Sequence, residues 1–308
     1  MQISKRHILL VFSILFVGLL SYAQQNDQLS QYPFNPLAIN PAYAGSRGGF
    51  SGVASARNQW AGFDGAPKTA AVCLHVAMKG DKMGLGLRLR DEKNVFDQKL
   101  EASVCYAYRL KLGNGKLGFG IAAGITNINY NWFNIEFKDQ ADKYASFQKT
   151  RKLLPKLDAG LLYNNAKSYV SISATNLYNG LSSSQDLPGY NSNLSPHLYF
   201  IYSRAFKVGD NFTLNPALNI KWAKANNPSI DLNMYANIKE LVWLGVGYRT
   251  NNTMIFLAQV ILNKKYKIGY SYDYYMNKKT LGKYPTHEII LSCDLNVFNS
   301  NSVSFRYF

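Results

Sequence analysis

The sequence contains no apolar run long enough to form a membrane-spanning helix. Its longest uncharged apolar stretch, residues 8–20, is shorter than the roughly 18 residues that such a helix needs. This stretch follows Lys5 and Arg6 and ends shortly before Ala23, which is the pattern of a secretory signal peptide cleaved after Ala23. We therefore predict that residues 1–23 are a signal peptide, and helical membrane insertion is excluded. The next residue is not cysteine, so a lipoprotein anchor has no support.

Reactive and metal-binding side chains are also scarce. The chain has 3 cysteines and 4 histidines, and an odd number of cysteines does not define a disulfide framework. No histidine can be placed beside a serine and an acidic residue from sequence spacing, as a nucleophilic site requires. His287 and Glu288 are neighbours in an extended stretch, so they point to opposite faces. We predict no catalytic site, no metal and no cofactor.

Acidic residues are few, with 18 Asp and Glu against 34 Lys and Arg, and the net charge is +16. Only two of the positive charges, Lys5 and Arg6, leave with the predicted signal peptide. So strong a basic balance often indicates a nucleic-acid partner. Export argues against that partner, and we predict no nucleic acid.

What the chain does contain is alternation of apolar and polar residues. Leu100 and Val104 alternate with Glu101, Ser103 and Cys105, which is the pattern of a strand with one face in lipid and one in a polar lumen. Fourteen stretches read this way: residues 50–57, 69–78, 83–90, 99–110, 117–129, 157–164, 169–176, 197–206, 212–222, 230–238, 241–249, 253–262, 267–275 and 288–297. We predict an all-β fold, a transmembrane antiparallel up-and-down β-barrel of about 14 strands over residues 49–308.

The connections between these stretches differ in length and charge. Those after even-numbered strands are short, whereas those after odd-numbered strands include residues 130–156 and 177–196. Short periplasmic turns and long external loops are typical of outer-membrane barrels. Ten lysines lie in or beside the short turns, against three acidic residues. These lysines either meet anionic headgroups of the inner leaflet or form a basic rim that docks a periplasmic partner.

Small residues gather on the predicted lumen face of three neighbouring strands: Gly84, Gly86, Ser103, Cys105, Ala107, Gly118, Gly120 and Gly124. Fourteen tilted strands give a barrel roughly 28 Å across, too wide for wall side chains to fill. The glycines either allow curvature and bulges or let another backbone lie against the wall. Residues 24–48, rich in Asn and Pro and without strand periodicity, are the candidate plug of the lumen.

Two further patterns have a structural and a functional interpretation. Residues 113–118 match the dinucleotide-binding pattern G-x-G-x-x-G, but an alternating strand follows where that motif needs a helix, so we predict a hairpin turn. Charged residues also face the predicted lumen, and they form either a salt-bridged wall or an anion-selectivity ring: Arg88, Arg90, Glu101, Arg109, Lys221, Asp231 and Asp273.

The Asn-Pro-rich segment carries a recognisable signature: Asn35, Pro36, Asn40, Pro41, Ala42, Tyr43, Ala44 and Gly45. It closely resembles that of the PorP/SprF family of type IX secretion system outer-membrane proteins. The resemblance resumes in the first predicted external loop, our candidate partner-binding loop: Arg57, Asn58, Gln59, Trp60, Gly62, Gly65, Ala66 and Pro67. It continues through residues 83–87, 106–110 and 306–308. The aromatic Phe308 also looks like an outer-membrane assembly signal, with the tail 298–308 either in the last strand or in the periplasm.

The resemblance implies an outer-membrane component of the apparatus with which Bacteroidota export large surface proteins, including gliding adhesins. Members are implied to receive or anchor cargo that carries a type B C-terminal domain. The expected partners are outer-membrane lipid, this cargo and periplasmic components of the secretion system. The alternative from another class is a diffusion porin or solute transporter, and a lipid-modifying enzyme ranks last.

Overall fold

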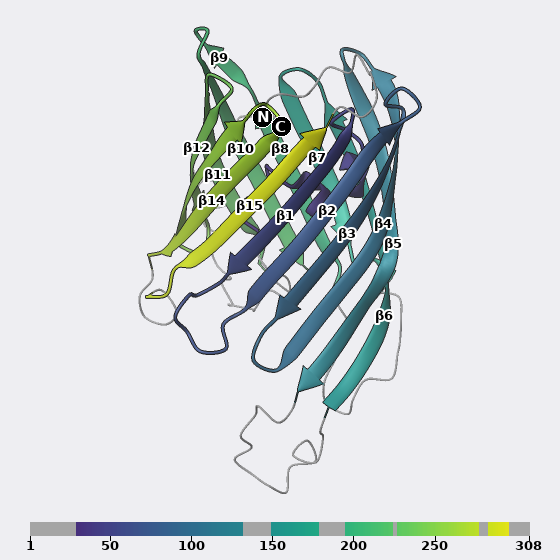
Figure 1. The fold of residues 1–308 in the computed structure, drawn as a ribbon, viewed down its shortest axis with the longest axis vertical. Coiled ribbons are helices and arrows are strands. Elements are labelled where there is room, and N and C mark those ends of the chain that lie inside the picture. The colour runs from purple at the N-terminus through teal and green to yellow at the C-terminus, as the bar shows by residue number, and fades with distance from the viewer. Residues whose placement is uncertain (1–28, 132–148, 179–194, 224–226, 277–282, 296–308) are drawn as a thin grey trace, which may run out of the picture.

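The chain forms a closed antiparallel β-barrel (Figure 1), and the computed structural model describes residues 29–131, 149–178, 195–223, 227–276 and 283–295. Its strands are β1 (Phe50–Asn58), β2 (Lys68–Met78), β3 (Met83–Lys93), β4 (Asp97–Leu112), β5 (Gly115–Asn131), β6 (Lys149–Asn164), β7 (Ser168–Thr175), β8 (His197–Arg204), β9 (Phe206–Val208), β10 (Phe212–Ala223), β11 (Ser229–Ile238), β12 (Val242–Arg249), β13 (Thr253–Leu262), β14 (Tyr266–Tyr275) and β15 (Thr286–Leu295).

With the exception of β8 and β9, strands that follow one another in sequence pair, and β1 closes the barrel by pairing with β15. β8 and β9 follow one another in a single barrel position, and both pair with β10. The barrel therefore has fourteen strand positions, which confirms the predicted fold class.

Side chains alternate between an exposed outer surface and a buried lumen. On β4, Val104 is 59% exposed, whereas the next residue, Cys105, is fully buried. Large apolar side chains such as Ile121, Leu153 and Leu232 face outward on other strands. This outer apolar surface is the one that a barrel presents to lipid hydrocarbon.

The two ends of the barrel differ as the sequence predicts. Tight turns close one end, here called the turn end and drawn at the top in Figure 1. At the turn between β11 and β12, Lys239 and Glu240 both have positive φ angles, as a two-residue hairpin requires. The turn between Leu112 and Gly115 joins β4 to β5, so the G-x-G-x-x-G pattern lies in a hairpin. The opposite end is the loop end.

The sixth strand corrects one predicted boundary. β6 begins at Lys149, eight residues before the predicted start, so the predicted loop 130–156 is shorter. Residues 149–158 pair with β5 but not with β7, whose pairing with β6 begins at Ala159. Among the described residues, 149–156 have a strand partner only in β5, so the missing N–H of Pro155 interrupts no described pairing with β7.

The helical elements of the described residues include two 3-10 turns, η1 (Pro36–Ala38) and η2 (Pro41–Tyr43). None of the helices in the described ranges is long and apolar enough to cross a membrane. The predicted signal peptide 1–23 and the tail 298–308 lie outside the described residues.

Candidate functional site

Residues 29–48, here called the luminal segment, lie inside the barrel and form the centre of its core. Each of its two Asn-Pro pairs starts a 3-10 turn, because proline fits the first helical position. The Asn40 side chain caps η2 by accepting a hydrogen bond from the backbone N–H of Ala42 at 2.8 Å. Ala42 and Ala44 are completely buried. The family-signature residues therefore lie against the barrel wall.

The segment rests on the small-residue wall of β3, β4, β5 and β6. A Cβ atom added at Gly84 would collide with the carbonyl of Ala44, and one added at Gly120 would collide with the backbone of Ala42. Cys105 and Ala107 are fully buried in the same core. Gly84, Gly118 and Gly120 of the predicted wall thus allow a second backbone to approach.

Two glycines modify that prediction. Gly124 lies close to β4, since the three atoms nearest to a Cβ added there belong to Ala102 and Ser103. Gly160 of β6 was missed, yet it lies under the Asn40 side chain and pairs directly with Gly120. The pairing register of β5 and β6 could have identified Gly160, because it places Gly160 directly beside Gly120 on the lumen face.

Asn40 is the main polar anchor of the segment on this wall. Its side-chain N–H₂ donates to the Leu161 carbonyl at 2.9 Å and to the Ser171 hydroxyl at 2.7 Å. Nearer the turn end, the Gly45 N–H donates to Nδ1 of His75 at 3.1 Å, so this inward histidine is a hydrogen-bond acceptor. The Arg109 guanidinium donates to the carbonyls of Ala44 and Met83.

An ion cluster at the loop-end side holds the start of the segment. It contains three cations and three carboxylates, all buried: Arg57, Lys221, Arg249, Asp231, Asp273 and Glu288. Ser30 joins them, since its hydroxyl donates to Asp273 at 2.8 Å and its N–H donates to Glu288 at 3.0 Å. The equal numbers of opposite charges explain how so many ionised groups remain inside the barrel.

The prediction that Arg57 belongs to the surface of the candidate partner-binding loop is therefore corrected, because its side chain is buried. Arg57 is the penultimate residue of β1, and its guanidinium lies in the lumen, 3.0 Å from both Asp273 and Glu288. Alternation along β1 places it inward, and the carboxylates that compensate it come from distant strands. Ala66 is also buried, so neither side chain is available at the loop surface.

A second ion cluster fixes the segment at the turn end. Arg47 lies 3.0 Å from Asp294, and Lys267 lies 2.7 Å from the same carboxylate. Arg47 also donates to the Tyr43 hydroxyl at 2.9 Å. On the far side of the barrel, the side-chain N–H₂ of Asn233 donates to the Tyr32 hydroxyl at 2.7 Å.

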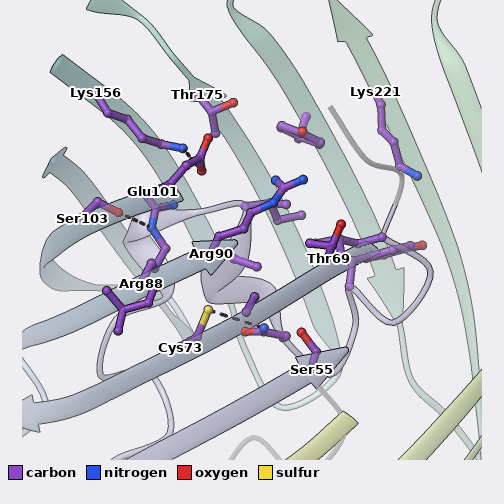
Figure 2. A pocket seen from close by; sticks show the side chains of 18 of the residues that line it. Ser55, Thr69, Cys73, Arg88, Arg90, Glu101, Ser103, Lys156, Thr175 and Lys221 are labelled. Carbon is purple, nitrogen blue, oxygen red and sulfur yellow. Dashed lines mark hydrogen bonds and ion pairs between the residues drawn. The ribbon is translucent and has the colours of Figure 1, made fainter. Parts of the chain in front are cut away.

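The luminal segment separates two cavities. Towards the loop end lies a small cavity of about 50 Å³ (Figure 2), where Lys156 pairs with Glu101 and Arg88 contacts Ser103. Arg88 also pairs with Asp158. The inward charges are thus mainly ion-paired, as in the salt-bridged interpretation, and do not form a ring of free cations. Towards the turn end lies a larger cavity of about 750 Å³.

The loop after β1 is ordered at the loop end. The Ala61 N–H donates to the Pro285 carbonyl at 2.7 Å, and the Phe63 ring packs edge-on against Tyr284 at 5.6 Å between centroids. Phe63 remains 44% exposed, with exposed Asp64 and Gly65 beside it. Apart from Arg57 and Ala66, the partner-binding role of this loop stays a prediction. Within the described ranges, no group of three His, Cys, Asp or Glu could hold a metal ion.

Comparisons with known proteins give one family and one fold. Residues 21–293 match the family described as type IX secretion system membrane protein PorP/SprF. None of the curated proteins searched matches the chain. Among solved structures, a monoaromatic hydrocarbon channel, CymD, is similar with a TM-score of 0.50 and 11% identity, covering 85% of this chain and 93% of that one. A Pseudomonas aeruginosa FadL homologue has a TM-score of 0.41 and 10% identity, covering 80% and 89%. At these identities the similarity concerns the fold alone.

Proposed function

The chain belongs to the PorP/SprF family of type IX secretion system membrane proteins, and on this premise we propose that it receives or anchors secreted surface proteins in the outer membrane. The cargo is a protein with a type B C-terminal domain, such as a gliding adhesin. It binds at the loop end, and the turn end faces the periplasm.

The observation that carries the proposal is the luminal segment. It crosses the lumen between the two cavities and contacts the wall through Asn40, Arg47 and the ion cluster at Ser30. A barrel filled in this way is poorly suited to free diffusion, which disfavours the porin alternative. A rigid barrel that carries ordered loops is well suited to recognition.

The cargo contact is proposed at Phe63 and Asp64. Both are exposed, and the backbone N–H groups of Trp60 and Ala61, earlier in the same loop, donate hydrogen bonds to residues 285–286. An aromatic side chain held in place on a loop loses little freedom on binding, which favours it as an interface anchor.

The test is binding of a purified type B C-terminal domain to the full-length barrel in detergent. The double variant Phe63→Ala/Asp64→Ala should weaken binding at least tenfold, and cells that carry it should lose the cargo from their surface. The matched control, Lys167→Ala/Lys207→Ala, changes two exposed residues at the turn end and should bind like the wild type. Equal binding by the wild type and the loop variant contradicts the proposed contact.

A further inference from the structure

The turn-end cavity, here called the vestibule, has the size of a binding site. Its volume of about 750 Å³ falls within the range of roughly 300–1,000 Å³ that is typical of ligand pockets. The luminal segment forms its floor with Tyr32, Pro33 and Phe34, and the barrel wall contributes Tyr235 and Trp243. Nothing in the proposed cargo contact uses these residues, because the cargo loop lies at the opposite end.

The vestibule has a mixed lining, in which polar residues such as Ser203 and Asn237 stand beside a group of apolar and aromatic side chains. Phe34 and Trp243 meet edge-on with ring centroids 5.9 Å apart, and Ile201, Ile261 and Ala217 also line the space. Gln259 contributes one polar group, since its buried side-chain N–H₂ has no hydrogen-bond partner among the described residues. This combination of apolar walls and a donor suits an apolar group attached to a hydrogen-bond acceptor.

The rim of the vestibule is basic. Its lining contains Arg47, Lys264, Lys265 and Lys267 against Glu240 and Asp294. Arg47 and Lys267 share Asp294, whereas Lys264 and Lys265 are exposed and form no ion pair with any residue that the structure describes. Their charges are complementary to an acidic partner.

We propose that the vestibule binds a segment of a periplasmic protein that inserts an aromatic or aliphatic side chain flanked by acidic residues. This inference rests on the proposed function in one respect, namely that the turn end faces the periplasm. The alternative occupant, an acyl chain of the inner leaflet, is disfavoured because it already lies in hydrocarbon and would remove no further apolar surface from water. An exposed side chain of a periplasmic protein does gain by burial.

The test uses the full-length barrel in lipid nanodiscs and a fluorescein-labelled octapeptide in which a central Phe-Leu pair is flanked by three acidic residues on each side. Fluorescence anisotropy gives the dissociation constant. Replacing the Phe-Leu pair by Ala-Ala should weaken binding at least tenfold, because a buried aromatic anchor carries most of the energy of such a contact. The variant Trp243→Ala should weaken it by a similar factor.

A second set of variants tests the basic rim. It changes only exposed residues, so that folding is preserved. Lys264→Glu/Lys265→Glu should weaken binding at least tenfold at low salt, and the difference from wild type should shrink as salt screens the rim. The matched control, Lys167→Glu/Lys207→Glu, makes the same charge change at the turn end outside the vestibule and should alter binding less than twofold.

Three results would overturn the inference: equal binding of the Ala-Ala peptide, an equal loss in the control variant, or displacement of the peptide by oleate at comparable concentration, which would indicate a lipid site. The variant Phe63→Ala/Asp64→Ala should bind the peptide like the wild type. The cargo proposal and the vestibule proposal can therefore fail independently of each other.

Discussion

Two sides of the same lumen hold the luminal segment in different ways. On the side of β3 to β6, the segment's backbone touches glycines directly, as at Gly84 and Gly120. On the opposite side, from β10 to β14, large side chains reach inward, and Asn233 contacts Tyr32. At Gly84 and Gly120 the first side leaves no room for a methyl group, whereas the second side leaves a cavity of about 750 Å³.

The luminal segment is therefore held in two ways, by close packing against glycines and by ion pairs. The glycine side depends on shape, so its contacts are sensitive to small increases in side-chain volume. The charge clusters at either end of the segment depend on balance, because a buried ion is costly once its partner is removed. The predictions below test first whether the segment fills the lumen, then the charge balance, then the fit.

The largest effect is expected from removal of the segment itself. Deleting residues 24–48 leaves a fourteen-position barrel roughly 28 Å across with nothing described in its lumen. We expect steady conductance in planar bilayers from the deletion variant and none from the full-length protein.

A length-matched control replaces residues 29–47 with Gly and Ser. It keeps the chain length but loses Asn40, Arg47 and the apolar contacts, so it should conduct like the deletion. Steady conductance from the wild type would favour the porin alternative and remove the contrast between a filled and an open lumen.

The next effect tests the ion cluster at Ser30. Arg57→Met keeps much of the side-chain volume but removes the cation from Glu288 and leaves Asp273 with Arg249 at 3.5 Å. We expect a loss of about 3–5 kcal/mol in the free energy of unfolding, as for other buried pairs that lose one partner. Urea unfolding in lipid vesicles measures it. Adding Glu288→Gln to Arg57→Met should recover part of the loss, and no recovery would show that charge balance is not the cause.

The strand pattern could be predicted from the sequence because it is local. Every strand residue faces either lipid or the polar lumen. The side on which Val104 and Cys105 lie can therefore be predicted from residue type alone, without knowing which strands pair. The small-residue wall followed from the same alternation. Gly160 was not predicted because Leu161 and Leu162 are both apolar, so residue type does not show which face of β6 points inward. In the structure Leu162 is buried and Leu161 is exposed.

The remaining features depend on pairings that sequence does not contain. The early start of β6 is stabilised by the long strand β5 rather than by its own alternation. Arg57 was assigned to a loop surface, but carboxylates more than two hundred residues away hold it in the lumen. The vestibule likewise arises only when Phe34 of the luminal segment meets Trp243 of β12.

The smallest expected effect tests the glycine side alone. Gly84→Ala adds one methyl group where the Ala44 carbonyl already lies, and neither backbone can move without breaking the Arg109 contacts. We expect a loss of about 1–3 kcal/mol in the free energy of unfolding, the usual range for overpacking, together with brief channel openings in planar bilayers as the segment leaves the wall. The matched control is Gly52→Ala on β1, whose added Cβ would meet a methyl of Leu74 at 3.1 Å and no part of the segment. That variant should stay closed. Openings of equal frequency in both variants would mean that the segment is held by its charge clusters and not by its fit to the wall.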